Sequence, residues 1–208
     1  MAKSSAEFDA WVDEAKPLAF RPRLITIGAR APEPSPVASV GRLSGTDIEQ
    51  SELAELLARR APFAEVATRV LERLTAGTSR RAAVYIPRAN QLRPVAAVGL
   101  SQQALLAIQG LPLERGYGSS AAAVRLRHPV FVADARCAPE WQQARPTVDA
   151  TGIVGVWSAP VLDGTQCIAT IAVYCDVPAV PNCSERAEIE VAVLILQLTA
   201  HLARGEGV

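Results

Sequence analysis

The stretch GVWSAPVLDGTQCIATIAVYC, at residues 155–175, decides how the sequence is interpreted. It contains two apolar runs, Val156–Val161 and Cys167–Tyr174, that predict two strands. The segment between them, Leu162–Thr165, includes an Asp-Gly pair, which is the strongest short signal for a hairpin turn. The two strands are therefore expected to pair antiparallel in one sheet.

A second hairpin and a further strand are predicted before this stretch. Arg81–Ile86 and Leu92–Val98 read as strands on either side of a turn at Pro87–Asn90. Pro129 introduces another strand at Val130–Ala133. Residues 134–154 follow no sustained period, so we expect a long irregular loop there.

Helices are predicted on both sides of this sheet-forming region. A connecting helix is expected over residues 47–61, and Pro62 suits the first position of the next helix, whose apolar residues follow i, i+3, i+4 spacing up to a glycine at Gly77. Two short helices, Gln102–Ile108 and Ala121–Arg125, are also expected, with Ser119 or Ser120 as the N-cap of the second.

The last helix carries two apolar stripes. It is expected to begin at Asn182 or Ser184 and to run to about Leu202. One stripe contains Ile189, Ala192, Val193 and Leu196, and the other contains Val191, Leu194, Ile195, Leu198 and Leu202. A helix that is apolar on two faces must be buried on two sides, so we predict a homodimer through this helix.

Composition excludes several classes of protein. Lys+Arg and Asp+Glu both total 21 in 208 residues, without the long runs of like charge typical of nucleic-acid-binding arms. No segment has the apolar length of a signal peptide or a membrane span, so we expect a cytoplasmic protein. The prevalence of Arg and Ala is typical of a GC-rich genome, and a bacterial source is expected. The four cysteines include no CxxC pair, which argues against a zinc site.

Residues 1–46 form an N-terminal extension of unknown role. A short amphipathic helix is predicted over Ala6–Ala15, and the alternating prolines of residues 31–36 favour an extended linker. The remaining organisation is one domain over residues 62–205, which is long enough to bury a single sizeable core.

The order of these blocks resembles the GAF domain family. Gly116–Ala121 and His128–Asp134 look like its glycine turn and its "PVxVxD" block. Gly155–Val161, Asp163-Gly164, Ile168–Tyr174 and Pro178–Glu185 resemble its "WSxPI…DGxxLGxxALY…P…E" block. Two positions depart from the pattern, since Ala169 replaces a glycine and Cys167 stands where an aliphatic residue is common.

The resemblance implies an α+β fold. We expect an antiparallel sheet of five or six strands, with the N- and C-terminal helices on one face and a loop-covered pocket on the other. It implies a stand-alone sensory module that binds a small molecule of unknown identity, dimerises and passes a signal to a partner protein. A domain that only dimerises, its pocket filled by its own side chains, is the alternative. Any cofactor is unknown, and we expect no nucleic-acid or membrane partner.

Candidate ligand-binding residues combine aromatic walls with a few polar groups, as small-molecule sites require. They are Tyr85, Val98, Tyr117, Asp134, Trp141, Arg145, Trp157, Ser158 and Tyr174. Each has a structural alternative. Trp157 and Ser158 are adjacent on a strand, so only one of them can face the pocket and the other packs in the core. Asp134 suits a cap as well as a ligand contact, and Trp141 with Arg145 four residues later forms either a lid over an anion or a loop anchor.

An enzymatic alternative rests on Cys137, in the loop near the expected pocket. One GAF relative, the free methionine sulfoxide reductase, uses a loop thiolate and a second, resolving cysteine. Cys167 and Cys175 are about 26 Å apart along one strand and cannot pair with each other. Bilin-binding relatives attach their chromophore to a cysteine followed by histidine, whereas Ala138 follows Cys137. We therefore expect no enzymatic activity and no catalytic residues.

Overall fold

The computed structural model describes residues 46–204, with side chains from Glu52 onward. The extension predicted over residues 1–46, with its helix at Ala6–Ala15, lies outside the described residues except for Thr46. The elements in chain order are α2 (Thr46–Ala58), α3 (Phe63–Thr75), β1 (Arg81–Arg88), β2 (Gln91–Val98), α4 (Gln102–Ile108), α5 (Ser119–Leu126), β3 (Val130–Val132), the 3₁₀ turn η1 (Pro139–Trp141), α6 (Arg145–Thr151), β4 (Gly155–Asp163), β5 (Gln166–Cys175) and α7 (Cys183–Ala203).

The strands form one antiparallel sheet in the order β2-β1-β5-β4-β3. This confirms the predicted α+β class and gives five strands. The Asp-Gly hairpin forms as expected, with Asp163 opposite Gln166 and Gly164 at a positive φ of 54°. The first hairpin is tighter than predicted, because β1 continues through Arg88 and only Ala89 and Asn90, both with positive φ, make the turn.

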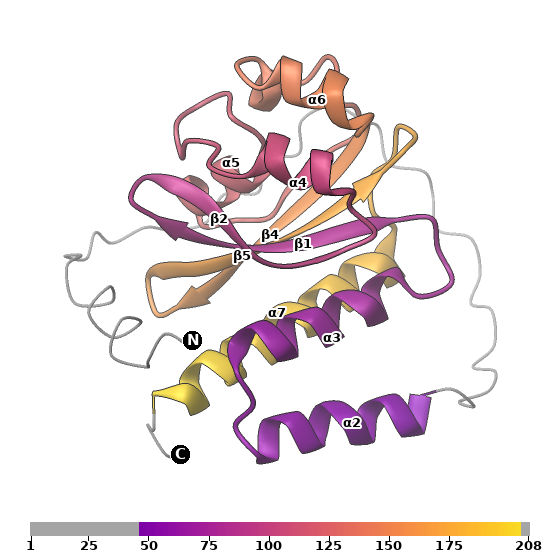
Figure 1. Ribbon diagram of the computed structural model, residues 1–208, viewed down its shortest axis with the longest axis vertical. Helices are drawn as coiled ribbons and strands as arrows, with labels where there is room; N and C mark the ends of the chain where they lie inside the picture. The colour runs from indigo at the N-terminus through magenta and orange to yellow at the C-terminus, as the bar shows by residue number, and fades with distance from the viewer. Residues whose placement is uncertain (1–45, 205–208) are drawn as a thin grey trace.

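The terminal helices cover one face of the sheet (Figure 1). α3 and α7 lie side by side on it, and α2 packs beyond them. α3 turns Val66, Val70 and Leu71 inward at the predicted helical spacing, and they meet Ile171 and Val173 of the sheet. The opposite face is covered by α4, α5 and α6, so the sheet lies between two layers of helices.

Two local predictions are corrected on that opposite face. α5 begins at Ser119 and its N-cap is Gly118, with φ 104°, so neither Ser119 nor Ser120 is the cap. Residues 134–154 are not irregular throughout, since η1 and α6 lie within them. Pro146 sits in the first turn of α6, where proline fits because the missing N–H would have no helical partner.

α7 is anchored at its start and half exposed along its length. Asn182 and Glu185 form a reciprocal capping box. The stripe containing Ile189 and Leu196 is buried against the sheet. The stripe on the other side leaves Val191, Leu194 and Leu198 exposed at 48%, 62% and 43%.

Candidate functional site

A row of small side chains crosses the middle of the sheet on the face below α4, α5 and α6. Ala97 of β2 is paired with Ala83 of β1, Ala83 with Ala172 of β5, and Ala172 with Ser158 of β4. Residues paired in this way point to the same side of a sheet. The row is therefore a low floor, and larger side chains must fill the volume above it.

Two tyrosines fill much of that volume. Tyr85 and Tyr174 stand on the same face, at either end of the pairing between β1 and β5, and their hydroxyls meet at 2.8 Å. Their rings therefore converge over Ala83 and Ala172. Both are at most 1% exposed, and burial raises the pKa of each phenol above its ordinary value. Both phenols stay neutral at physiological pH.

A cluster of buried serines lies beside the tyrosines. The hydroxyl of Ser158 is 3.0 Å from those of Ser119 and Ser120 in the first turn of α5. All three residues are buried, so their hydroxyls satisfy one another away from water. The predictions treated Ser119 and Ser120 as caps and missed this role, because nothing local in the sequence links them to a strand 38 residues later.

Trp141 closes the site from the loop side. Its ring lies against Gly118, where an added Cβ would come within 3.3 Å of the indole. The tryptophan is 3% exposed, and its indole Nε1 is buried with no hydrogen-bond partner. A buried N–H without an acceptor costs about 1–3 kcal/mol.

Arg145, predicted together with Trp141, begins α6. One of its terminal nitrogens donates to the Ala138 carbonyl at 3.3 Å, which ties α6 back to the preceding loop. Its Nε is buried without an acceptor. The two predicted lid residues thus belong to consecutive short helices, and each offers a buried N–H.

Asp134 forms a local turn. Its carboxylate accepts from the backbone N–H of Arg136 at 2.9 Å and from the Arg136 side chain at 2.9 and 2.7 Å. The Arg136 hydrogen bonds lower the pKa of Asp134 from 3.8 to about 2. The carboxylate is therefore already satisfied by its own loop, as in an Asx turn.

An Arg136→Gln substitution is expected to raise the pKa of Asp134 from about 2 toward its ordinary 3.8. Because the folded pKa lies below the unfolded one, the ion pair stabilises the fold fully above about pH 4 and loses its effect as pH falls toward 2. NMR titration of the carboxyl carbon measures the midpoint. Arg125→Gln, which removes an arginine bonded to the carbonyls of Leu113 and Glu114, should leave that midpoint unchanged. An Asp134 midpoint near 3.8 in the wild-type protein would contradict the prediction.

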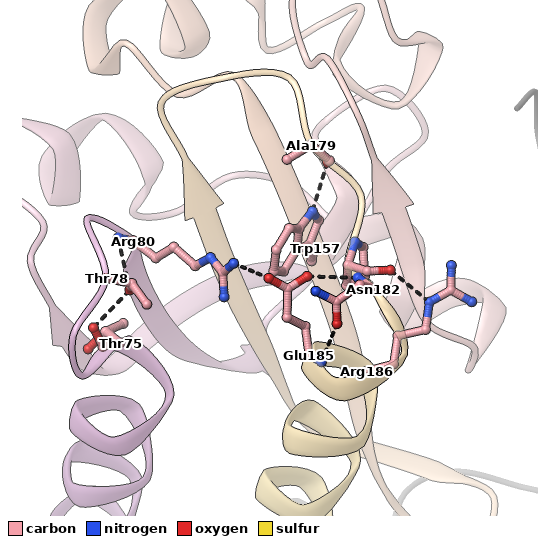
Figure 2. A network of polar contacts seen from close by, with 9 residues as sticks. Thr75, Thr78, Arg80, Trp157, Ala179, Asn182, Glu185 and Arg186 are labelled. Atoms are coloured by element: carbon pink, nitrogen blue, oxygen red, sulfur yellow. Dashed lines mark hydrogen bonds and ion pairs between the residues drawn. The ribbon is translucent and has the colours of Figure 1, made fainter. Parts of the chain in front are cut away.

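Trp157 lies on the other face of the sheet from Ser158. Its Nε1 donates to the Ala179 carbonyl at 2.8 Å, and the Arg80 guanidinium stands 4.7 Å from its ring centre (Figure 2). Arg80 also pairs with Glu185 of the capping box. Trp157 therefore packs on the side of the sheet that α7 covers, and Val98 lies on that side as well.

The other predicted residues are gathered on the loop side. Tyr117 is half-buried and packs against the same cluster as Tyr85, Trp141 and Tyr174. Ser158 is part of the small-residue floor, whereas Asp134 and Arg145 belong to the segment between β3 and β4 and contact residues of that segment. The described surface has a hollow of about 410 Å³ elsewhere, between α2 and α3, which is lined mainly by glutamates and arginines joined in ion pairs.

The cysteines do not converge on the site. All four are free thiols, and Cys137 is exposed in the loop after Asp134. Burial raises the pKa of Cys167 to about 12. It also raises the pKa of Cys175, which packs in the core between the sheet and the helices α3 and α7. Within residues 46–204 no cluster of His, Cys, Asp and Glu could hold a metal ion, and no helix is long and apolar enough to cross a bilayer.

Comparison with known proteins shows which family this architecture resembles. The model of the GAF domain matches residues 62–204. No curated protein sequence matches the chain. Many solved structures do, at identities that show a common fold alone.

Three of these structures illustrate the range. A free methionine-R-sulfoxide reductase from Neisseria meningitidis, in complex with its substrate, has TM-score 0.61 and 13% identity, covering 80% of this chain and 98% of that one. The GAF domain of a phosphoenolpyruvate-protein phosphotransferase from Coxiella burnetii has TM-score 0.58 and 16% identity, covering 78% and 99%. A domain of a putative two-component sensor histidine kinase from Sinorhizobium meliloti 1021 has TM-score 0.52 and 21% identity, covering 69% and 96%.

Proposed function

The chain belongs to the GAF domain family, and on that basis we propose that it is a cytoplasmic sensory module. It binds a small molecule on the loop side of the sheet, dimerises through α7 and passes the change to a partner protein. The observation that supports ligand binding is the set of buried polar groups above a floor of alanines. Small-molecule sites are built in this way, from apolar walls and a few placed donors and acceptors.

Dimerisation through α7 is supported by the exposed apolar stripe of this helix. Val191, Leu194 and Leu198 form a contiguous apolar strip on a helix whose other side is already buried. Exposed apolar patches of this kind mark interaction surfaces. Similar folds in a sensor histidine kinase and a chemotaxis protein support a role in signalling.

A thermal-shift experiment tests ligand binding. The full-length protein is heated with nucleotides, organic acids, nitrate, haem and bilins in turn. A ligand at 100 times its Kd adds about 2.7 kcal/mol to the free energy of unfolding, which should raise Tm by about 5–10 °C. Native mass spectrometry of protein purified from its own host gives an independent readout. If no compound shifts Tm and no small molecule is retained, the domain is a dimerisation adaptor with a self-filled pocket.

A second candidate function is reduction of free methionine sulfoxide. The Neisseria enzyme and related reductases of Staphylococcus aureus and Thermoplasma acidophilum have similar folds. This chemistry needs a reactive thiolate and a resolving thiol within reach. Cys137 is exposed, but burial keeps Cys167 and Cys175 protonated. Turnover of methionine sulfoxide that disappears in a Cys137→Ser variant would favour the enzyme over the sensor.

A further inference from the structure

The loop side of the sheet contains several buried donors that have no acceptor. The indole Nε1 of Trp141 and the Nε of Arg145 are buried without a hydrogen-bond partner, and both can only donate. The hydroxyl of Thr170 is also buried and unpartnered, and the residue is 0% exposed. Native proteins rarely keep such groups without a reason, because each one costs free energy.

Two of these groups, Thr170 and Trp141, border the small-residue floor. Thr170 lies two residues before Ala172 on β5, where side chains point to the same face, and its partner across β1 is Tyr85. Trp141 rests on Gly118, directly before the serines that contact Ser158 at the other end of the floor. The floor is thus flanked on both sides by hydrogen-bonding groups that point away from water.

The charge of this region favours an anion. Arg145 brings a guanidinium that donates to a backbone carbonyl, while the carboxylate of Asp134, which also feels the charge of Arg145, is held by hydrogen bonds from Arg136. The tyrosines and Trp141 supply aromatic walls. This combination suits a molecule with a carboxylate for the donors and an apolar body for the rings.

We infer that the loop side binds a small organic carboxylate with an apolar body, and that the Tyr85–Tyr174 pair competes with it for the space above the floor. This inference rests on the proposed sensory function. The two rings pack in the loop-side cluster, and the contact between their hydroxyls, at 2.8 Å, joins them across the floor. Rotation of either ring away from the other uncovers Ala83 and Ala172 and opens the space above them for the ligand. A ligand that binds the open arrangement alone shifts the protein toward it.

The competition makes a specific prediction for affinity. When the binding-competent arrangement is sparsely populated, the apparent Kd is raised by the inverse of its population. Tyr85→Phe removes the hydroxyl contact but keeps the ring, so it weakens the closed pair. The apparent affinity for a carboxylate is expected to increase about tenfold, the equivalent of about 1.4 kcal/mol. Thr199→Val, which removes a buried hydroxyl of α7 on the other side of the sheet, is the matched control and should leave the affinity unchanged.

The test uses ¹⁹F NMR titration of the full-length protein with 3-fluorobenzoate and with the neutral 3-fluorobenzyl alcohol. We expect 3-fluorobenzoate to bind with a Kd of about 1 mM and the alcohol to bind at least about tenfold more weakly. Arg145→Gln should remove most of this preference, and Trp141→Phe should weaken carboxylate binding about tenfold. Circular dichroism melting of each variant verifies that it is folded.

Equal affinity for the two probes would overturn the carboxylate assignment. Unchanged or weaker binding by folded Tyr85→Phe would overturn the competition, since the hydroxyl would then be a ligand contact. A cationic or uncharged molecule retained from the host, with no 3-fluorobenzoate binding, would refute this inference and leave the proposed sensory function standing. The sensory function itself fails only if the thermal-shift panel and native mass spectrometry both detect no ligand.

Discussion

A Leu194→Glu variant is expected to be monomeric at the micromolar concentrations at which we expect the wild-type protein to form the proposed dimer. Leu194 is 62% exposed at the centre of the α7 stripe, between Val191 and Leu198. In a two-fold symmetric dimer every substitution occurs twice in the same interface. Burying an unpaired carboxylate in place of an apolar contact costs about 2 kcal/mol or more per copy, so Kd should rise about a thousandfold.

Sedimentation velocity over a range of concentrations measures this change. Leu106→Glu is the matched control, because Leu106 is 65% exposed on α4, on the other side of the sheet. It should leave the dimer intact. A wild-type protein that sediments as a monomer at micromolar concentration, or a Leu194→Glu variant that remains dimeric, would contradict dimerisation through this stripe.

The fold could be predicted from sequence because its signals are local. The helical spacing of Val66, Val70 and Leu71 predicts which side of α3 is buried, and the structure confirms it. The Asp-Gly turn predicts the β4–β5 hairpin through backbone geometry that depends on two residues. Such features need no knowledge of distant contacts.

The sequence could not predict in the same way which side chains of the central strands point to which face of the sheet. Val156, Trp157, Ser158 and Ala159 are all buried, since helices cover both sides of the sheet. A strand buried on both faces shows no alternation of polar and apolar residues, so its sequence does not reveal which residues point to which side. Only the contacts of Trp157 in the folded protein place it on the side of the sheet that α7 covers.

The serine cluster and α6 were hidden for a related reason. Ser119 and Ser120 are good capping residues by composition, but Gly118 occupies the cap and frees their hydroxyls for Ser158. α6 has seven residues with Pro146 in its first turn and only Val148 fully buried. Its stability comes from packing on the loop side of the sheet, and packing of this kind leaves little periodicity in the sequence.

Because Trp157 points into the core on the α7 side of the sheet, its removal is expected to have a large effect on stability. A Trp157→Ala substitution is expected to lower the free energy of unfolding by about 3–5 kcal/mol, the usual cost of removing a buried aromatic ring. The residue is 2% exposed, and its loss would leave the Ala179 carbonyl without its indole donor and Arg80 without its aromatic partner (Figure 2). Urea denaturation followed by circular dichroism gives the free energy directly.

Trp157→Phe separates the packing of this ring from its hydrogen bond. Phenylalanine keeps most of the apolar contact and a ring face for Arg80 but has no N–H for Ala179, so the expected loss is about 1–2 kcal/mol. Because the ring lies on the α7 side, Trp157→Phe should leave the affinity of the loop side for 3-fluorobenzoate within twofold of wild type, whereas Trp141→Phe should not. If Trp157→Phe weakened that binding as much as Trp141→Phe did while costing no stability, Trp157 would be a ligand contact and its assignment to the core would have to be abandoned.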